Sequence, residues 1–114
     1  MSRASDARVI LLFDGAELVG VGGHHLANEN GVRYRYLRGY AIALHMRGKV
    51  LSDGIKSSDA LMNILLSDAR GQSGELPVLA HVHQDNSRCL SFMKRRQCIV
   101  SPEVEDDLLL VLLT

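Results

Sequence analysis

A segment in the middle of the chain combines glycines and cations directly before a predicted helix. The apolar run Tyr40–His45 leads into Arg47–Lys49 (Arg-Gly-Lys) and Asp53–Ile55 (Asp-Gly-Ile), and apolar residues recur at helical spacing from Ser58. A glycine-containing turn that opens a helix presents unpaired backbone N–H groups, and the helix dipole favours negative charge there. The segment therefore predicts a binding site for a phosphate-bearing cofactor.

Four of the five histidines lie in pairs that invite comparison with metal sites. His81 and His83 would share one face of a strand, whereas the adjacent His24 and His25 would face opposite ways. A metal site needs about three or four converging ligands. Because no Cys-x-x-Cys or His-x-x-x-His spacing accompanies these residues, no metal site is expected.

Apolar patterning predicts the strands of the first half of the chain. The runs Arg8–Phe13 and Leu18–Gly23 flank a turn at Asp14–Glu17, which predicts a hairpin. A third strand is expected over Val32–His45. Its alternation of arginine and tyrosine predicts one cationic and one aromatic face.

The second half is expected to hold two helices and three strands. Ser57 or Ser58 should cap the first helix, Gly71 should stop it, and Asp85 or Asn86 should cap the second. The strands are expected at Val78–Val82, Cys98–Val100 and Leu108–Leu113, with an acidic link (residues 103–107) before the last. This order predicts one α/β (α+β) domain over residues 1–114, with a mostly antiparallel sheet, a parallel central pair and two crossover helices.

Composition narrows the class of protein. The 13 basic and 13 acidic residues cancel, which argues against nucleic-acid binding driven by bulk charge. Cys89 and Cys98 have no disulfide or zinc spacing and are expected to be reduced core thiols. The N-terminus is polar and the apolar run Leu108–Leu113 is too short to span a bilayer, so we expect a cytoplasmic protein without a membrane partner.

The order of elements and several motifs resemble the GCN5-related N-acetyltransferase (GNAT) superfamily, counted from that family's second strand. The segment Asp14–Gly20 is similar to the family's (D/N)G-x-(L/I)-V-G turn, and His83–Cys89 is similar to its Val-x-x-x-Asn-x-x-Ala motif. The resemblance covers roughly Arg8–Thr114. It implies a GNAT-like sheet without the family's first strand and first two helices.

The resemblance also implies a cofactor and the residues that hold it. In the family, two strands splay apart, pantetheine lies along one of them, and pyrophosphate sits on the following loop. Acetyl-coenzyme A would then be the cofactor, and an amine on a small molecule or peptide the acceptor. The implied cofactor-binding residues are Ala43, Leu44, His45, Arg47, Gly48, Lys49, Gly54, Ile55 and Asn86. His45, near the acetyl group, would take the proton from the amine.

Departures from the family pattern leave alternatives open. The two loop glycines are six residues apart, with Asp53 between them. Met93 stands where the family often has a tyrosine that acts as a general acid. These departures favour a catalytically degenerate GNAT-fold protein that binds a partner or small ligand. A third alternative is a homodimer formed through the apolar run Leu108–Leu113.

Overall fold

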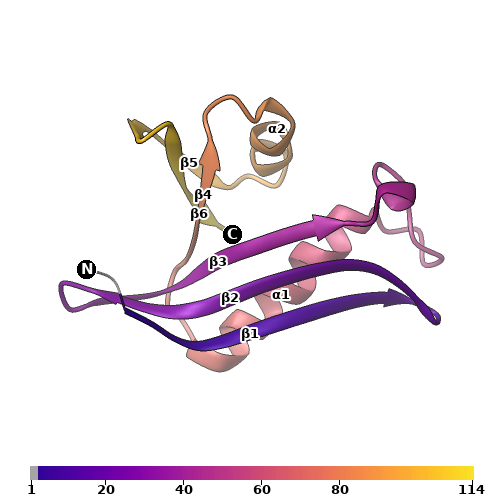
Figure 1. Ribbon diagram of the computed structural model, residues 1–114, viewed down its shortest axis with the longest axis horizontal. Coiled ribbons are helices and arrows are strands. Elements are labelled where there is room, and N and C mark those ends of the chain that lie inside the picture. The colour runs from indigo at the N-terminus through magenta and orange to yellow at the C-terminus, as the bar shows by residue number, and fades with distance from the viewer. Residues whose placement is uncertain (1–2) are drawn as a thin grey trace.

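Six strands form one sheet in the order β1-β2-β3-β4-β6-β5 in the computed structural model, which describes residues 3–114 (Figure 1). The sheet is mostly antiparallel, and two helices connect its later strands, so the predicted mixed α+β architecture is confirmed. The elements are β1 (Arg3–Asp14), β2 (Glu17–Glu29), β3 (Val32–Ile42), α1 (Ser57–Ser73), β4 (Val78–His83), α2 (Ser87–Arg95), β5 (Ile99–Glu105) and β6 (Leu108–Leu113).

Tight turns join β1 to β2 and β2 to β3. The first lies where the sequence predicts it, and β1 and β2 are longer than predicted. Gly15 takes a φ of +64° in the first turn, and Asn30 and Gly31 take positive φ in the second. β2 runs six residues past Gly23, the last residue of the predicted strand, to Glu29. Gly22 lies beneath α1, where a Cβ would come within 2.6 Å of Leu65. The glycine therefore allows close packing of the helix on the sheet.

β3 ends three residues earlier than predicted. The Ala43 amide still donates to the Val19 carbonyl at 2.8 Å, and the chain then forms a short 3₁₀ helix, η1 (Leu44–Met46). His45 therefore lies on a helical turn beyond the sheet rather than on a strand. Arg35, on the predicted cationic face of β3, is completely buried.

β3 and β4 are parallel neighbours that stay paired only briefly. Their register holds two residue pairs, Arg35 with Val78 and Tyr36 with Leu79. Beyond Tyr36 the two strands diverge, and Figure 1 shows β3 running to one end of the molecule while β4 turns away from it. The parallel central pair is thus confirmed, and the sheet is split at its middle.

The helix ends differ from the predictions in two places. Lys56 is the N-cap of α1 and supplies no side-chain bond, while the Ser57 hydroxyl donates instead to the Met46 carbonyl at 2.8 Å. α1 continues through Gly71 to Gly74, whose φ of +63° ends it. The cap of α2 is as predicted, because the Asn86 side chain accepts from the Cys89 amide.

The acidic segment near the C-terminus is a strand rather than a link. β5 extends to Glu105, and the chain reverses within Asp106 and Asp107, both of which take positive φ. Aspartate tolerates this left-handed conformation better than most residues, which permits so tight a turn.

Both helices pack on the same face of the sheet. One apolar cluster joins Met62 and Leu66 of α1 to Met93 of α2 and Val111 of β6, and a second lies between α1 and the hairpin of β1 and β2. In the described part of the chain, neither helix has the length and apolar character needed to cross a membrane. Figure 1 looks onto the opposite face of β1–β3, with α1 behind the strands.

Candidate functional site

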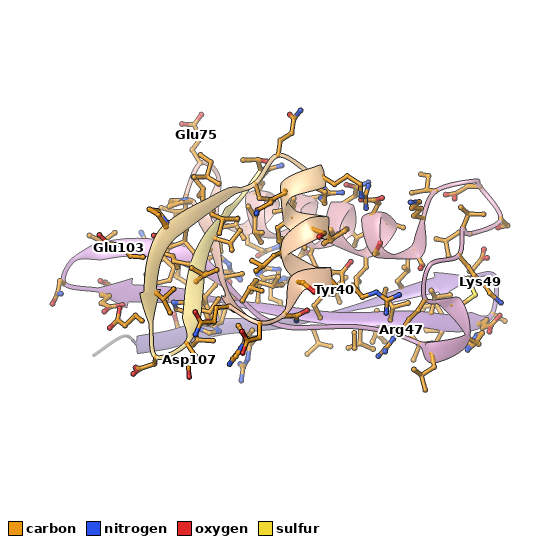
Figure 2. All side chains as sticks on the ribbon, turned by 90° about the horizontal axis from the view of Figure 1, so that it is seen from above. Tyr40, Arg47, Lys49, Glu75, Glu103 and Asp107 are labelled. Carbon is orange, nitrogen blue, oxygen red and sulfur yellow. The ribbon has the colours of Figure 1, made fainter. Side chains whose placement is uncertain are left out.

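The predicted cofactor segment forms a folded loop at one end of the molecule. It leaves β3 through η1, makes a small hairpin in which Val50 bridges to Lys56, and enters α1 at Ser57. Arg47 and Lys49 lie at this end in Figure 2, far from the turn that carries Asp107. The structure therefore brings most of the predicted cofactor residues together in one loop.

The backbone amides of this loop are largely occupied by the loop itself. Leu51 donates to Ile55 at 2.8 Å, Gly54 to Leu51 at 2.9 Å, and Ser57 to Lys49 at 3.0 Å. The amides of Arg47 and Lys49 likewise donate to carbonyls of η1. These donors are already satisfied, so the loop does not offer an anion the open set of N–H groups that its glycines predict.

Acidic side chains brace the same loop. The Asp53 carboxylate accepts from the Ile55 amide at 3.0 Å, so it turns back onto its own hairpin. Asp14, in the first β-turn, accepts from the Ser52 hydroxyl at 2.6 Å and from its amide at 3.2 Å. The loop is thus fixed to the tip of the β1–β2 hairpin, and Gly48, with a φ of +72°, turns the chain beside it.

His45 is exposed and paired with a carboxylate. Its Nε2 atom contacts Glu17 at the start of β2, and both side chains are 57 % exposed. Leu44, next to it, is 79 % exposed. A carboxylate that holds an imidazole fixes the orientation of its ring, which suits proton transfer with a molecule arriving from solvent.

Aromatic and charged side chains join β3 and the start of α1 to α2, on the helical side of the diverging strands. The Tyr40 hydroxyl donates to the Ser58 carbonyl, and its ring lies 6.1 Å from that of Phe92. Burial raises the pKa of Tyr40, so its hydroxyl stays protonated. Asp59 pairs with Arg95 at 3.1 Å and Arg96 at 2.9 Å, which ties the start of α1 to the end of α2.

Asn86 lies away from the loop. It is at the start of α2, where its side chain accepts from the Cys89 amide at 3.1 Å and its own amide donates to the His83 carbonyl at 2.9 Å. Figure 1 places this end of α2 above the sheet and η1 at the far end of β3. The two groups of predicted cofactor residues therefore lie on opposite sides of the split in the sheet.

Sequence reasoning missed a tyrosine–histidine pair beside that split. The Tyr36 hydroxyl lies 2.7 Å from His81 Nδ1, and the His25 ring lies 5.5 Å from the Tyr36 ring on the other side. Burial raises the pKa of Tyr36. The alternation of tyrosines in β3 was a signal for cross-strand contacts, but the parallel register that brings His81 close has no local signature.

It also missed a chain of hydrogen-bonded polar and charged groups beneath α1, in which Arg35 and His24 are buried. Asp68 of α1 lies 2.7 Å from His24 Nε2, His24 Nδ1 lies 2.9 Å from the Arg35 guanidinium, and Arg35 bonds Asp6 at 3.0 Å. Arg8 adds a two-bond contact with Asp68, at 2.7 and 3.1 Å. Since Arg35 donates to Nδ1, the bond to Asp68 is donated by Nε2–H of a neutral imidazole.

The pKa values in this network follow from its geometry. Burial lowers the pKa of His24, against the hydrogen bond to Asp68, which raises it. The hydrogen bond from Arg8 lowers the pKa of Asp68, with a further contribution from His24. Folding therefore favours a neutral His24 between an ionised Asp68 and a cationic Arg35.

Within residues 3–114, no three histidine, cysteine or acidic side chains converge as a metal site would require. A shallow depression lies along α1, away from the predicted cofactor loop, and is lined by Asn63, Ile64, Ser67, Asp68, Gly71 and Gln72. No protein-family model matches this chain, and a search of curated protein sequences gives no significant match.

Proposed function

We propose that this protein is an acetyl-coenzyme A-dependent N-acetyltransferase of the GNAT type that acts on an amine. The observation that carries the proposal is the split in the sheet, because β3 and β4 pair at two positions and then separate. The mostly antiparallel sheet, its parallel central pair and the two crossover helices agree with the predicted topology. Backbone groups of β3 beyond Tyr36 have no partner strand on the β4 side in the described register, so that edge can bind an extended arm.

The fit to the cofactor comes from side chains more than from backbone amides. Arg47 and Lys49 are cations on an exposed loop, and Asp53 is turned onto the Ile55 amide. The cations can therefore hold a pyrophosphate by charge, although the loop amides bond one another. Bound acetyl-coenzyme A would supply the activated acetyl thioester. His45, oriented by Glu17, would accept the proton of the attacking amine.

Isothermal titration of the purified chain with acetyl-coenzyme A tests this proposal, with desulfo-coenzyme A and ATP as comparison ligands. We expect saturable micromolar binding. Arg47→Ala should weaken it about tenfold, because a charge-assisted contact to phosphate is lost. The matched control is Arg33→Ala, an exposed arginine at the opposite end of β3, which should leave binding unchanged.

A second function, a GNAT-fold protein that binds a partner without catalysis, is favoured by one observation. The loop amides that would cradle a pyrophosphate already donate to carbonyls within the loop. Absence of binding at millimolar acetyl-coenzyme A, in a chain shown to be folded, would refute the enzyme and leave this alternative.

A further inference from the structure

One face of the β1–β3 half of the sheet exposes apolar side chains. Leu12 points toward α1 and is 5 % exposed, whereas its neighbours Leu11 and Phe13 point the other way and are 50 % and 52 % exposed. Val9 on the same side is 72 % exposed. In the described residues both helices pack on the other face, so we call this one the free face.

The apolar side chains of the free face form a continuous surface across two strands. Leu11 is the register partner of Val21, and Phe13 is the partner of Leu18, so each pair lies side by side on one face. Val21 and Leu18 are themselves 37 % and 44 % exposed. Clusters of exposed apolar residues of this kind mark surfaces that bind another protein.

The charges that border this surface are few and of opposite sign. Arg38 lies over Gly23 on the free face, because a Cβ on Gly23 would be 3.5 Å from its Cγ atom. Glu29, farther along β2, accepts from the Tyr34 hydroxyl at 3.2 Å. The face is apolar at its Val9–Phe13 end and carries His25 and Tyr36 farther along. A nearly neutral face does not match a highly charged partner, whereas a second copy of the same face is equally neutral.

The size of the free face is sufficient for a dimer. Its strands hold 12, 13 and 11 residues. At about 3.3 Å per residue and about 4.8 Å between strands, the face measures roughly 40 by 15 Å, or about 600 Å² per copy. Two copies would then bury about 1,200 Å², the lower end of the range for stable interfaces.

We propose that two copies of this chain associate through their free faces, stacking sheet on sheet. The arrangement would cover the exposed valine, leucine and phenylalanine side chains of both copies, as the inner faces of a β-sandwich are covered. It does not depend on acetyl transfer. It also differs from pairing through β6, because that strand is already hydrogen-bonded on both sides, to β4 and β5.

Sedimentation and light scattering over a wide range of concentration test the dimer. The wild-type chain should show twice its mass of 12.5 kDa at high concentration. Leu11→Glu should raise the dissociation constant about tenfold or more, since it places a charge in the apolar centre of the interface. Val104→Glu is the matched control, because Val104 on β5 is 48 % exposed and lies outside the free face.

Two results would overturn the proposal. One is a wild-type chain that stays monomeric at every concentration. The free face would then bind a different partner rather than a second copy. The other is a dimer whose dissociation constant is the same in the Leu11→Glu and Val104→Glu variants. Circular dichroism checks the fold of each variant, and Val9→Lys, at the more exposed position, replaces Leu11→Glu if that variant does not fold.

Discussion

The two faces of the β1–β3 sheet reverse the usual distribution of polar and apolar groups. The face beneath α1 buries Arg35 and His24, with 1 % or less of each residue exposed, whereas the free face exposes Val9, Leu11 and Phe13 by half or more. In this sheet a side chain is buried where another group bonds to it or packs on it, whether the side chain is polar or apolar. Charged groups can be covered because they pair with one another, and apolar groups stay exposed where nothing packs on them.

Among the variants that compare the two faces, substitution of Arg35 should cause the largest loss of stability. Arg35→Met removes the cation that joins His24 to Asp6, so we expect a loss of about 3 kcal/mol in the free energy of unfolding. Chemical denaturation measures it. Arg33→Met, at an exposed position two residues earlier on the same strand, should change stability by less than about 0.5 kcal/mol. Equal losses in the two variants would mean that the hydrogen bonds of Arg35 do not add to the free energy of unfolding.

Glycine-to-alanine substitutions on the two faces should change stability by smaller amounts. Gly22→Ala places a Cβ within 2.6 Å of the buried Leu65 side chain, which should cost about 1–3 kcal/mol through overpacking. Gly39→Ala, on the free face of β3, meets nothing within 4 Å and should be neutral or stabilise by about 0.5 kcal/mol. Thermal unfolding of the two variants at one concentration compares them, and a similar loss in both would contradict the assignment of faces.

The smallest expected effect is a dependence of stability on pH. Burial lowers the pKa of His24 from its ordinary 6.5, so as pH falls below 6.5 the unfolded chain takes up this proton before the folded chain does. The free energy of unfolding should therefore decline below pH 6.5, and decline again below about 3.8 as Asp68 is protonated.

His24→Gln should cost about 1–2 kcal/mol at neutral pH and flatten the first decline. His25, whose pKa burial also lowers, contributes to the same range, so His25→Gln serves as the comparison variant. Denaturation curves at a series of pH values separate the two. An unchanged slope in His24→Gln would show that the buried imidazole is not the group that titrates.

Much of the fold could be predicted because its signals are local. The turn at Asp14–Glu17, the cap at Asn86 and the apolar runs of β4 and β6 each depend on a few adjacent residues. Strand and helix ends were harder. Gly71 has the residue type of a helix stop, yet the helix continues to Gly74, and nothing near Gly71 in sequence distinguishes the two glycines.

The buried network could not be predicted, because its members are distant in sequence. Arg8 and Asp68 are 60 residues apart, and His24 and Asp68 are 44 apart. Alternation in β3 assigned Arg35 to a cationic face, but no local pattern shows that this charge will be buried against His24 and Asp6. For the predicted cofactor loop, residue types indicated a glycine-containing turn before α1 but not that its amides would bond one another.

The brief pairing of β3 with β4 has a consequence for how the chain is made. β1, β2, β3 and α1 are complete at Ser73. Their strands join the rest of the sheet through two residue pairs, and α1 also packs on α2 and β6. During synthesis this N-terminal part can therefore fold as it leaves the ribosome, because its hairpins need only residues already made. β4, α2, β5 and β6 would then assemble last, on a template that already exists.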